Sequence, residues 1–235
     1  VSIVIPIYGQ EDLTRQCLNS ILNAKTNVHY EIICMDNGSG PEIEKLLEEY
    51  AKYKNVKYTK NKENYNFAIG CNIGFTHTTG NIIVFLNNDT TVTDYWLDEL
   101  IKPLSLEKIM AVQPKLLYPD QTIQNIGVVF AEKQTLGYPI YAGLNNNITP
   151  AQTSRSYQAV TAACLGIRRN DFIKAKGFDP IFINGQEDID LCLRLTIGTD
   201  NKCWFQSTST VIHHESKTPG RGKYIPINRL NFVRR

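Results

Sequence analysis

A compact cluster of oxygen-bearing side chains, Asn87, Asn88 and Asp89, comes directly after the apolar run 82–86. Five apolar residues in a row indicate a strand buried on both faces, as in a parallel sheet covered by helices. Open α/β sheets bind ligands beyond the carboxyl ends of their strands, and hard cations prefer carboxylate, amide and phosphate oxygens. Taken alone, the cluster fits a cation site beside a phosphate and an ordinary turn equally well.

Polar residues also end two earlier predicted strands. Pro6 and Tyr8 lie at the end of the first strand, and Asp36 follows the second. Because parallel strands present their carboxyl ends at one edge of the sheet, these residues and Asp89 should meet there. Asp36 could accept hydrogen bonds from a base or ribose, while Asp89 could hold a cation that bridges a diphosphate. The coincidence of the strand ends favours a nucleotide site over routine turns.

Two familiar phosphate-binding motifs are absent from the sequence. The first strand leads into Gly9-Gln10-Glu11, which lacks the GxGxxG pattern of dinucleotide sites, and no GxxxxGK[ST] motif occurs. The segment 64–74 is rich in asparagine and glycine at a predicted helix start, where backbone N–H groups could approach a phosphate. Asn66 and Asn72 in this segment, with Asn88, are candidate nucleotide contacts. An asparagine-capped, closely packed helix explains the segment equally well.

A second acidic cluster, Glu187, Asp188 and Asp190, begins a predicted helix after Gly185. Helical spacing puts Asp188 on a face with apolar residues, where a carboxylate is costly unless a function such as general-base catalysis requires it. The alternative is a carboxylate at the helix N-terminus, which the helix dipole favours, and spacing does not decide between the two. Asp190 and Arg194 form an i, i+4 pair, for which we expect a structural role.

His213 and His214 end a strand-like stretch and precede a glycine- and lysine-rich run. Adjacent side chains on a strand point to opposite faces, so at most one imidazole should face a site that contains Asp89. That imidazole could complete the ligand shell of a cation, and Arg221 or Lys223 could neutralise a diphosphate. Without the other motifs, a solvated basic loop with incidental histidines is the better explanation.

Alternating strands and helices account for the first hundred residues. Such βαβ alternation implies right-handed crossovers and a mostly parallel sheet with flanking helices, which is an α/β fold. The predicted strands are 2–8, 30–35, 56–59 and 82–86, and the apolar stripes of helices fall at 13–22, 43–50, 67–76 and 97–104.

Beyond Pro103 the pattern changes. The stretch 137–156, rich in Asn, Gly, Pro and Thr, is typical of a mobile loop, and loops this long are usually functional lids or disordered. We find no sharp domain boundary, and expect one domain over 1–235 with a nucleotide-type half, 1–103, and a second half, 104–235. The remaining predicted elements are strands at 111–118, 123–131, 158–167 and 204–213, a short helix at 171–176 and the acidic helix after Gly185.

Composition indicates an ordinary globular chain. Its 235 residues, 42% of them hydrophobic, can bury a full core. The formal charge of +2 is far from the concentrated basic surface that nucleic-acid binding requires, so we expect no nucleic-acid partner. None of the six cysteines forms a CxxC pair, and we expect free, buried thiols.

The sequence contains no apolar run of bilayer length and no leader pattern. We therefore expect a cytoplasmic protein, with peripheral association with the inner face of the membrane as the alternative. The chain starts inside a strand at Val1 and stops at Arg235 without a closing signal, so the natural protein is expected to be longer. Any membrane association would come from regions outside these residues.

Five stretches together resemble the family 2 glycosyltransferases of the GT-A type, which are inverting, metal-dependent enzymes that use nucleotide sugars to build polysaccharides. They occur in the order and approximate spacing of that family, so the resemblance covers nearly the whole chain. Two more stretches, 112–120 and 163–168, resemble the bacterial rhamnosyltransferase-like subgroup of surface-polysaccharide enzymes. The five stretches are 1–8, 36–39, 64–74, 85–89 and 187–190.

The resemblance implies a GT-A fold, with a Rossmann-like central sheet and a smaller acceptor-side region, and it implies roles for particular residues. Asp188 would be the catalytic base, and Asp89 would bind Mg²⁺ or Mn²⁺. The metal motif of the family often carries two carboxylates, but the cluster at 87–89 offers one, which either weakens the metal site or shifts part of the metal binding to His213 or His214. The implied nucleotide contacts are Pro6, Tyr8, Asp36, Asn66, Asn72 and Asn88, and the implied sugar contacts are Glu187 and Gly166.

The implied reaction is a single displacement from a UDP- or dTDP-linked sugar to a hydroxyl of a glycan, lipid-linked or glycoprotein acceptor. It requires Asp89 and Asp188 to converge on one cleft.

Two alternatives to this function remain. A sugar nucleotidyltransferase would need a glycine-rich, basic loop after the first strand, where this chain has the acidic segment 9–12. A sugar-nucleotide-binding module without turnover is favoured by the single carboxylate of the metal motif.

Overall fold

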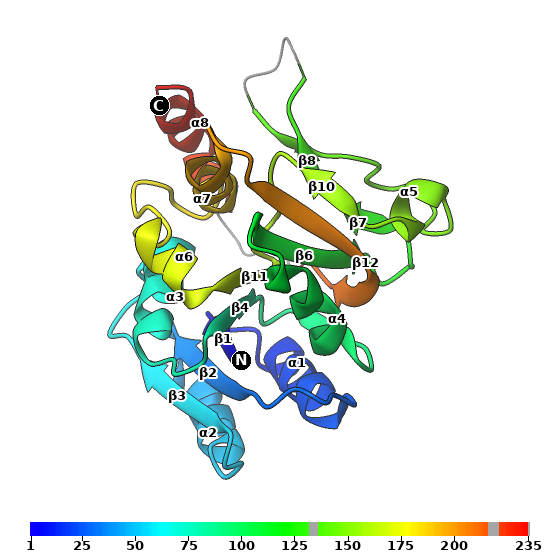
Figure 1. Ribbon diagram of the computed structural model, residues 1–235. Helices are drawn as coiled ribbons and strands as arrows, with labels where there is room; N and C mark the ends of the chain where they lie inside the picture. Colours follow the sequence, from blue (N-terminus) through cyan, green and yellow to red (C-terminus); the bar gives the residue numbers. More distant parts are fainter. Residues whose placement is uncertain (132–135, 216–220, 235) are drawn as a thin grey trace.

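The computed structural model describes residues 1–131, 136–215 and 221–234. In these residues a ten-stranded sheet of order β10-β12-β6-β11-β4-β1-β2-β3, with β5 beside β12 and β7 beside β6, lies between two layers of helices (Figure 1). The strands are β1 Ser2–Ile7, β2 Glu31–Asp36, β3 Val56–Lys60, β4 Ile82–Leu86, β5 Thr90–Val92, β6 Ile109–Leu117, β7 Ile123–Asn125, β8 Val128–Val129, β9 Tyr138–Pro139, β10 Arg155–Tyr157, β11 Cys164–Arg168 and β12 Lys202–His213. The helices are α1 Glu11–Asn23, α2 Pro41–Tyr50, α3 Asn66–Thr76, α4 Trp96–Ile101, α5 Thr149–Gln152, α6 Arg169–Lys174, α7 Glu187–Thr196 and α8 Ile225–Val233, with single 3₁₀ turns at Lys102–Ser105 and Arg221–Tyr224.

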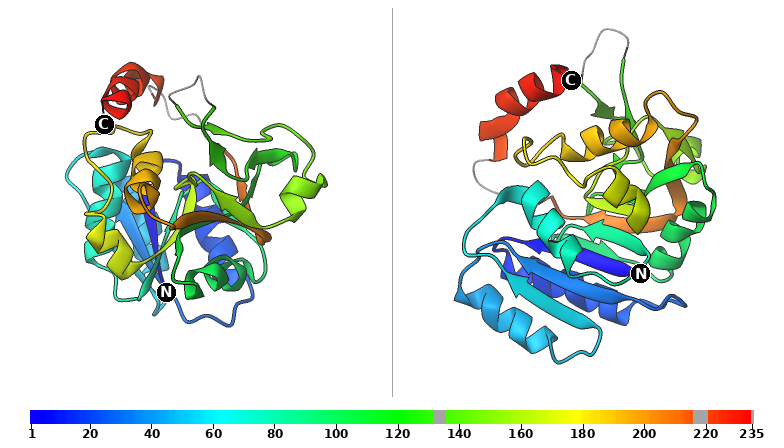
Figure 2. Two further views of the ribbon diagram at one scale, coloured as in Figure 1. Left: turned by 45° about the horizontal axis from the view of Figure 1, so that its top comes forward. Right: turned by 60° about the vertical axis from the view of Figure 1, so that its left-hand side comes forward.

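The first half of the chain forms the parallel part of the sheet, as predicted. β1 pairs in parallel with both β2 and β4, and β2 pairs in parallel with β3. Both faces of β1 are covered by helices (Figure 2). Ile3 and Ile5 pack into the core cluster that contains residues of α1, α2 and α4, whereas Val4 packs into the cluster that contains residues of α3, α6 and α7. The strand is apolar at every position because alternate side chains meet opposite helical layers.

The second half extends the sheet with mixed pairing. β11 inserts antiparallel between β4 and β6, and β12 runs parallel to β6. The far end of β12 pairs antiparallel with β5, in a register that puts His213 opposite Thr90. Since Thr90 follows Asp89 in the chain, this pairing carries the histidines to the end of β4. The predicted α/β architecture, with helices on both faces of a central sheet, is confirmed.

Three predicted elements of the second half need correction. The stretch 123–131 is interrupted, because Gly127 has a φ of +139° that a straight strand cannot accommodate, and it gives only β7 and β8. The stretch 137–156 was expected to be a structureless loop but contains β9, α5 and the start of β10, and Ala151 is fully buried. The strand expected at 158–167 starts only at Cys164, since 158–163 crosses toward α7 instead of pairing along the sheet.

All six cysteines are free and buried, as the sequence predicts. Burial raises the pKa of the Cys17 thiol to about 12, so it packs as a small apolar group beside Thr90.

Of the helices in the described residues, none is long and apolar enough to cross a membrane.

Candidate functional site

A cavity of about 620 Å³ lies where the parallel strands β1, β2 and β4 end. The segment before β11 and the start of α7 close its opposite side, so residues from both halves of the chain line it. The lining residues include Pro6–Tyr8, Asn37, Asn64 and Asn87–Asp89 from the first half, and Tyr118, Gln124, Asn125, Thr161–Ala163, Asn184–Ile189, His213, Glu215 and Tyr224 from the second. Asp89 and Asp188 therefore converge on one cavity, as the sequence analysis required.

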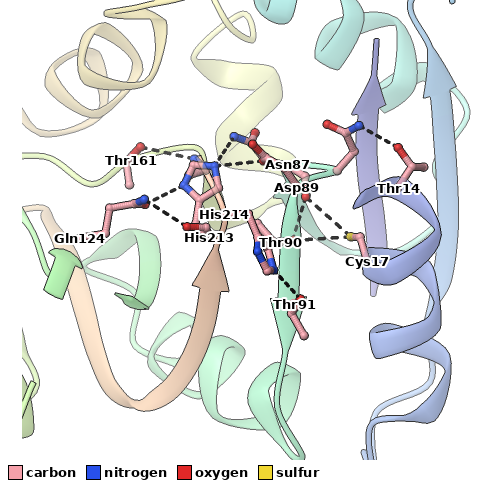
Figure 3. A network of polar contacts seen from close by, with 12 residues as sticks. Thr14, Cys17, Asn87, Asp89, Thr90, Thr91, Gln124, Thr161, His213 and His214 are labelled. Carbon is pink, nitrogen blue, oxygen red and sulfur yellow. Dashed lines mark hydrogen bonds and ion pairs between the residues drawn. The ribbon is translucent and has the colours of Figure 1, made fainter. Parts of the chain in front are cut away.

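Asp89 and His213 form the polar centre of one wall (Figure 3). Oδ1 of Asp89 lies 3.0 Å from Nε2 of His213, and both residues are buried, at 6% and 5% exposure. The Nδ1 atom of the same imidazole lies 2.6 Å from Oε1 of Gln124. The side chain of His214 instead points to Thr91, at 3.0 Å, and does not line the cavity. As strand geometry predicts, only one of the two histidines faces the site.

The donor atoms of this wall suit a divalent cation. A carboxylate oxygen is an ordinary ligand of both Mg²⁺ and Mn²⁺, while an imidazole nitrogen suits a transition metal such as Mn²⁺ better than Mg²⁺. Here the two donors lie side by side at the strand-end cavity. Within the described ranges, no three His, Cys, Asp or Glu side chains cluster as a complete protein metal site. Asp89 and His213 would thus supply two ligands, and the substrate or water would have to supply the rest.

Asp188 lies in the first turn of α7, where its carboxylate is held from two sides. The backbone N–H of Ala162 donates to Oδ2 at 3.0 Å, and the N–H of Ile189 donates to Oδ1 at 2.8 Å. Asp188 is half-buried at the cavity, while Glu187 and Asp190 are the buried acids of this turn. Its position at the helix N-terminus, where the dipole favours an anion, also suits a carboxylate.

The other two acids of α7 have structural contacts. Oε2 of Glu187 accepts a hydrogen bond from the N–H of Gly185 at 2.6 Å, so this carboxylate closes the loop before the helix while also lining the cavity. Asp190 pairs with Arg194 at 2.8 Å, and Arg194 also donates to the carbonyl oxygens of Ala175 and, at 2.9 Å, Gly177. The predicted i, i+4 pair thus ties α7 to the loop after α6.

Three of the predicted nucleotide contacts at the strand ends, Pro6, Tyr8 and Asn88, line the first-half wall of the cavity, and Tyr8 is 49% exposed. Asp36 is not among the lining residues. Asn88 donates to Oγ1 of Thr14 at 2.8 Å, which joins the end of β4 to α1. Asp36 is 1% exposed and accepts a hydrogen bond from the N–H of Ser39 at Oδ1, while its Oδ2 has no partner among the described residues.

Asn37, which was read only as part of a turn, organises this wall. Its amide group donates to Asn64 at 3.0 Å and to the backbone oxygen of Asn66 at 2.8 Å, and its oxygen accepts from Asn61 at 2.9 Å. The next residue, Gly38, has a φ of +82°, and a Cβ there would come 2.5 Å from the backbone of Glu63. The sequence Asp-Asn-Gly-Ser therefore builds a tight junction between β2 and the loop before α3.

Three further predicted contacts also lie outside the cavity lining. Asn66 caps α3, with Oδ1 accepting from the N–H of Ile69 at 3.3 Å, so the capping alternative explains it. Asn72 pairs with the backbone of Phe178 in both directions, at 2.8 and 3.0 Å. Gly166 sits inside the sheet, where a Cβ would face Leu100 and leave the cavity untouched. These positions give no structural support for direct ligand contact.

The structure describes only part of the glycine- and lysine-rich run after the histidines. Residues 216–220 and the side chain of Arg221 lie outside the described residues. The ammonium of Lys223 lies 5.5 Å from the ring of Tyr224, which itself lines the cavity.

Sequence reasoning missed the two loops that complete the second wall. One is 161–163, which presents the N–H that binds Asp188 and is itself held by Gln113, whose Oε1 accepts from Thr161 at 3.0 Å. The other is 184–186, in which all three residues have positive φ values, from 52° to 157°. The Asn-Gly pair at its start was the available signal, because these residue types favour left-handed backbone.

An α/β sheet with both faces covered and a cavity at its strand ends is the arrangement in which open α/β proteins bind their ligands. Residues 2–172 match the description "Glycosyl transferase family 2". The chain belongs to this family. The comparison covers the whole first-half wall and reaches past β11 into α6.

Similar proteins agree with this assignment. The chain is 34% identical over 223 residues to the O-antigen biosynthesis protein RfbC of Myxococcus xanthus, covering 92% of this chain and 17% of that protein. It is 22% identical over 245 residues to a chondroitin synthase of Escherichia coli, covering 94% of this chain and 35% of that protein. The chain thus spans about a third or less of the length of these two relatives.

Two solved structures share the fold. GalNAc-T7 in complex with UDP, GalNAc and Mn²⁺ superposes with a TM-score of 0.72 at 19% identity, covering 90% of this chain and 43% of that one. The mannosyltransferase PcManGT of Pyrobaculum calidifontis, in complex with GDP-mannose and Mn²⁺, gives a TM-score of 0.72 at 13% identity, covering 100% of this chain and 64% of that one. The GT-A type of fold is confirmed.

Proposed function

We propose that this domain is an inverting glycosyltransferase, which moves a sugar from a nucleoside diphosphate sugar to a hydroxyl group of an acceptor in polysaccharide or glycoconjugate synthesis. The observation that carries the proposal is the convergence of Asp89 and Asp188, from opposite halves of the chain, on one cavity at the strand ends. The names of the O-antigen and chondroitin relatives support a glycan product.

The first-half wall is proposed to bind the nucleotide. Asp36 keeps one buried carboxylate oxygen without a partner in the described chain, and such an oxygen favours a ligand donor such as a base N–H or a ribose hydroxyl. Pro6, Tyr8 and Asn88 line the path from there to Asp89. UDP and GDP in the complexes of the structural neighbours support a nucleoside diphosphate, with UDP or dTDP as the expected form.

Asp89 and His213 are proposed to hold Mn²⁺ or Mg²⁺ against the diphosphate. A bound divalent ion would stabilise the negative charge that develops on the departing diphosphate, an effect worth several kcal/mol in metal catalysis generally. The Mn²⁺ ions in both neighbouring complexes support this assignment. Asn87, which donates to Nε2 of His213 at 3.3 Å, would help to orient the imidazole.

Asp188 is proposed as the general base. Its carboxylate takes the proton from the acceptor hydroxyl, whose oxygen forms a bond to the anomeric carbon as the bond from that carbon to the diphosphate oxygen breaks. Attack from the face opposite the leaving group inverts the configuration. The two backbone N–H groups on Asp188 fix the orientation of the carboxylate toward the cavity, which is the geometry that a base needs.

A sugar-nucleotide-binding module without turnover is the second candidate. One observation favours it: the motif 87–89 carries a single carboxylate, and within the described residues no three His, Cys, Asp or Glu side chains cluster as a metal site. Such a module would bind a nucleoside diphosphate with Mn²⁺ but would not cleave a donor.

A donor panel separates the two functions. UDP-, dTDP- and GDP-sugars are incubated with the protein and Mn²⁺, with glycan and lipid-linked acceptors, and released diphosphate is measured. Transfer with inversion, read from the anomeric coupling constant of the product, supports the enzyme. Tight nucleotide binding with no diphosphate release from any donor supports the module.

A further inference from the structure

Gln124 makes an unusual pair of contacts with one residue. It is the central residue of β7, it is 9% exposed, and it lines the cavity. Its Oε1 lies 2.6 Å from Nδ1 of His213, and its Nε2 donates to the backbone carbonyl oxygen of His213 at 3.4 Å (Figure 3). One side-chain amide thus contacts both the ring and the main chain of the same histidine.

These two contacts fix which nitrogen of His213 carries the proton. The amide group of Gln124 cannot be flipped, because a carbonyl oxygen can accept only from its NH₂ end. Oε1 therefore faces Nδ1, and an oxygen can only accept there, so the neutral ring must carry its proton on Nδ1. The other ring nitrogen, Nε2, is left with a lone pair.

The surroundings of Nε2 agree with this assignment. The NH₂ group of Asn87 lies 3.3 Å away and can donate to a lone pair, whereas it would clash electrostatically with a second N–H. On its other side Nε2 lies 3.0 Å from Oδ1 of Asp89. In the Nδ1–H tautomer, Nε2 and this carboxylate oxygen are both acceptors, and a cation bound between them would satisfy both.

The strand that carries Gln124 is itself held firmly. β7 pairs antiparallel with β6, with Asn125 opposite Leu116. Gln113, which is fully buried in β6, donates to both the backbone and side-chain oxygens of Asn125 at 3.1 Å. Gln124 is consequently presented from a fixed backbone, which is what a residue that orients another side chain requires.

We propose that Gln124 is the positioning residue of the cation site: it fixes His213 as the Nδ1–H tautomer and keeps the Nε2 lone pair directed into the cavity beside Asp89. This inference rests on the proposed metal-dependent function for its purpose, but the tautomer can be measured without any metal. Partners of this kind on a ligating histidine typically change metal affinity by about 10- to 100-fold when they are removed.

Three variants test the proposal. Gln124→Met keeps the length of the side chain but removes the acceptor, whereas Gln124→Glu keeps an acceptor for the Nδ1 proton. Gln158→Met makes the same exchange at an exposed glutamine that binds the N–H of Phe130 outside the cavity, and serves as the control. Two-bond ¹H–¹⁵N spectra of the metal-free proteins report which imidazole nitrogen is protonated. The chain has four histidines, so His213→Ala suffices to assign the signal.

The same proteins are titrated with Mn²⁺ at a fixed high concentration of UDP, and again with dTDP and GDP, while electron paramagnetic resonance measures free Mn²⁺. We expect the Nδ1–H tautomer of His213 in the wild type, in Gln124→Glu and in Gln158→Met. Gln124→Met should lose this preference and bind Mn²⁺ about 10- to 100-fold more weakly.

A wild-type His213 protonated on Nε2 would overturn the proposal, as would a Gln124→Met variant that keeps both the tautomer and the Mn²⁺ affinity. If the wild type shows the expected tautomer and Gln124→Met loses it, but no nucleotide supports Mn²⁺ binding, the metal part of the proposed function fails while the positioning role of Gln124 stands. The two failures are therefore distinguishable.

Discussion

Arg194 shows how single side chains fix the position of the proposed base. Its guanidinium joins Asp190 on α7 to the carbonyl oxygens of the 175–177 segment, and Asp190 is only 5% exposed. Removal of the arginine leaves a buried carboxylate without its cation, which is far more costly than loss of an exposed ion pair. The first turn of α7, which carries Asp188, depends on this anchor.

Arg194→Met is expected to lower the free energy of unfolding by about 2 kcal/mol or more. Lys108→Met is the matched control, because Lys108 and its partner Asp200 are 69% and 85% exposed. We expect no measurable change for the control. Urea unfolding of both variants provides the comparison, and equal stability of the two would contradict a structural role for the Asp190–Arg194 pair.

For single residues, the sequence predicts which residues lie near the site better than it predicts where their side chains point. Local pattern marked Asp89, Asp188 and His213 as residues at strand ends or a helix start, and the resemblance to the family implied that Asp89 and Asp188 share a cleft. Asn72 and Gly166 were misplaced, since their directions depend on Phe178 and on β6, which are remote in sequence. The contact between Gln124 and His213 also joins distant segments, and no local spacing reports it.

Individual elements are joined at the strand starts as well as at the strand ends. Glu31, at the start of β2, accepts hydrogen bonds from Ser2 of β1 at 2.7 Å, from Thr79 before β4 at 2.6 and 2.7 Å, and from Lys57 of β3 at 2.9 Å. Four strands of the parallel half are therefore linked through one carboxylate. Burial alone raises the pKa of Glu31, but the hydrogen bonds from Thr79, Ser2 and Lys57 outweigh it and lower the pKa to about 2.

This depressed pKa gives a pH dependence with a definite sign. In the unfolded chain Glu31 titrates near 4.5, so its contribution to stability is complete above that pH and is lost as the pH falls from about 4.5 to about 2. Glu31→Gln should be less stable than the wild type at pH 7, and the difference in Tm should shrink across this acidic range. Glu44→Gln, which removes an exposed pair with Lys60, is the control. A pH-independent difference for Glu31→Gln would contradict the account.

Helices and strands could be predicted from the sequence where the pattern that causes them is local. The parallel half was predicted to within a few residues, because each helix stripe and buried strand there has an uninterrupted period. The region 123–163 was not, because Gly127 breaks a strand where the ring of Tyr157 lies against it, and α5 is a single turn. Short elements that tertiary contacts stabilise leave little periodic signal.

On the scale of the whole molecule, the cavity is the junction of the two halves of the chain. The first half contributes the strand ends and the second contributes β12, the 161–163 loop and α7. A ligand that contacts both walls binds only the folded state, so it must stabilise the complete domain by mass action. Composition and length predicted one globular domain, and the resemblance implied that Asp89 and Asp188 meet in one cleft, but the loops that join the two halves there became evident only from the structure.

UDP with Mn²⁺, at about 100 times the dissociation constant, is expected to stabilise the domain by about 2.7 kcal/mol. For a chain of this size that corresponds to a rise in Tm of roughly 5–10 °C. Differential scanning fluorimetry measures the shift, with dTDP and GDP tested in parallel. The shift should shrink for Asp89→Asn and stay unchanged for Lys108→Met. Absence of a shift with all three nucleotides would argue against a nucleotide site in this cavity.

The division of labour between Asp89 and Asp188 is the central claim, and one comparison tests it most directly. Transfer of sugar to acceptor and the affinity for nucleotide with Mn²⁺ are measured side by side for the wild type, Asp188→Asn and the exposed control Asp200→Asn. The account predicts that Asp188→Asn loses roughly 100- to 10,000-fold in transfer rate with unchanged nucleotide affinity, and that the control matches the wild type. Near-normal transfer by Asp188→Asn would contradict the assignment of the base.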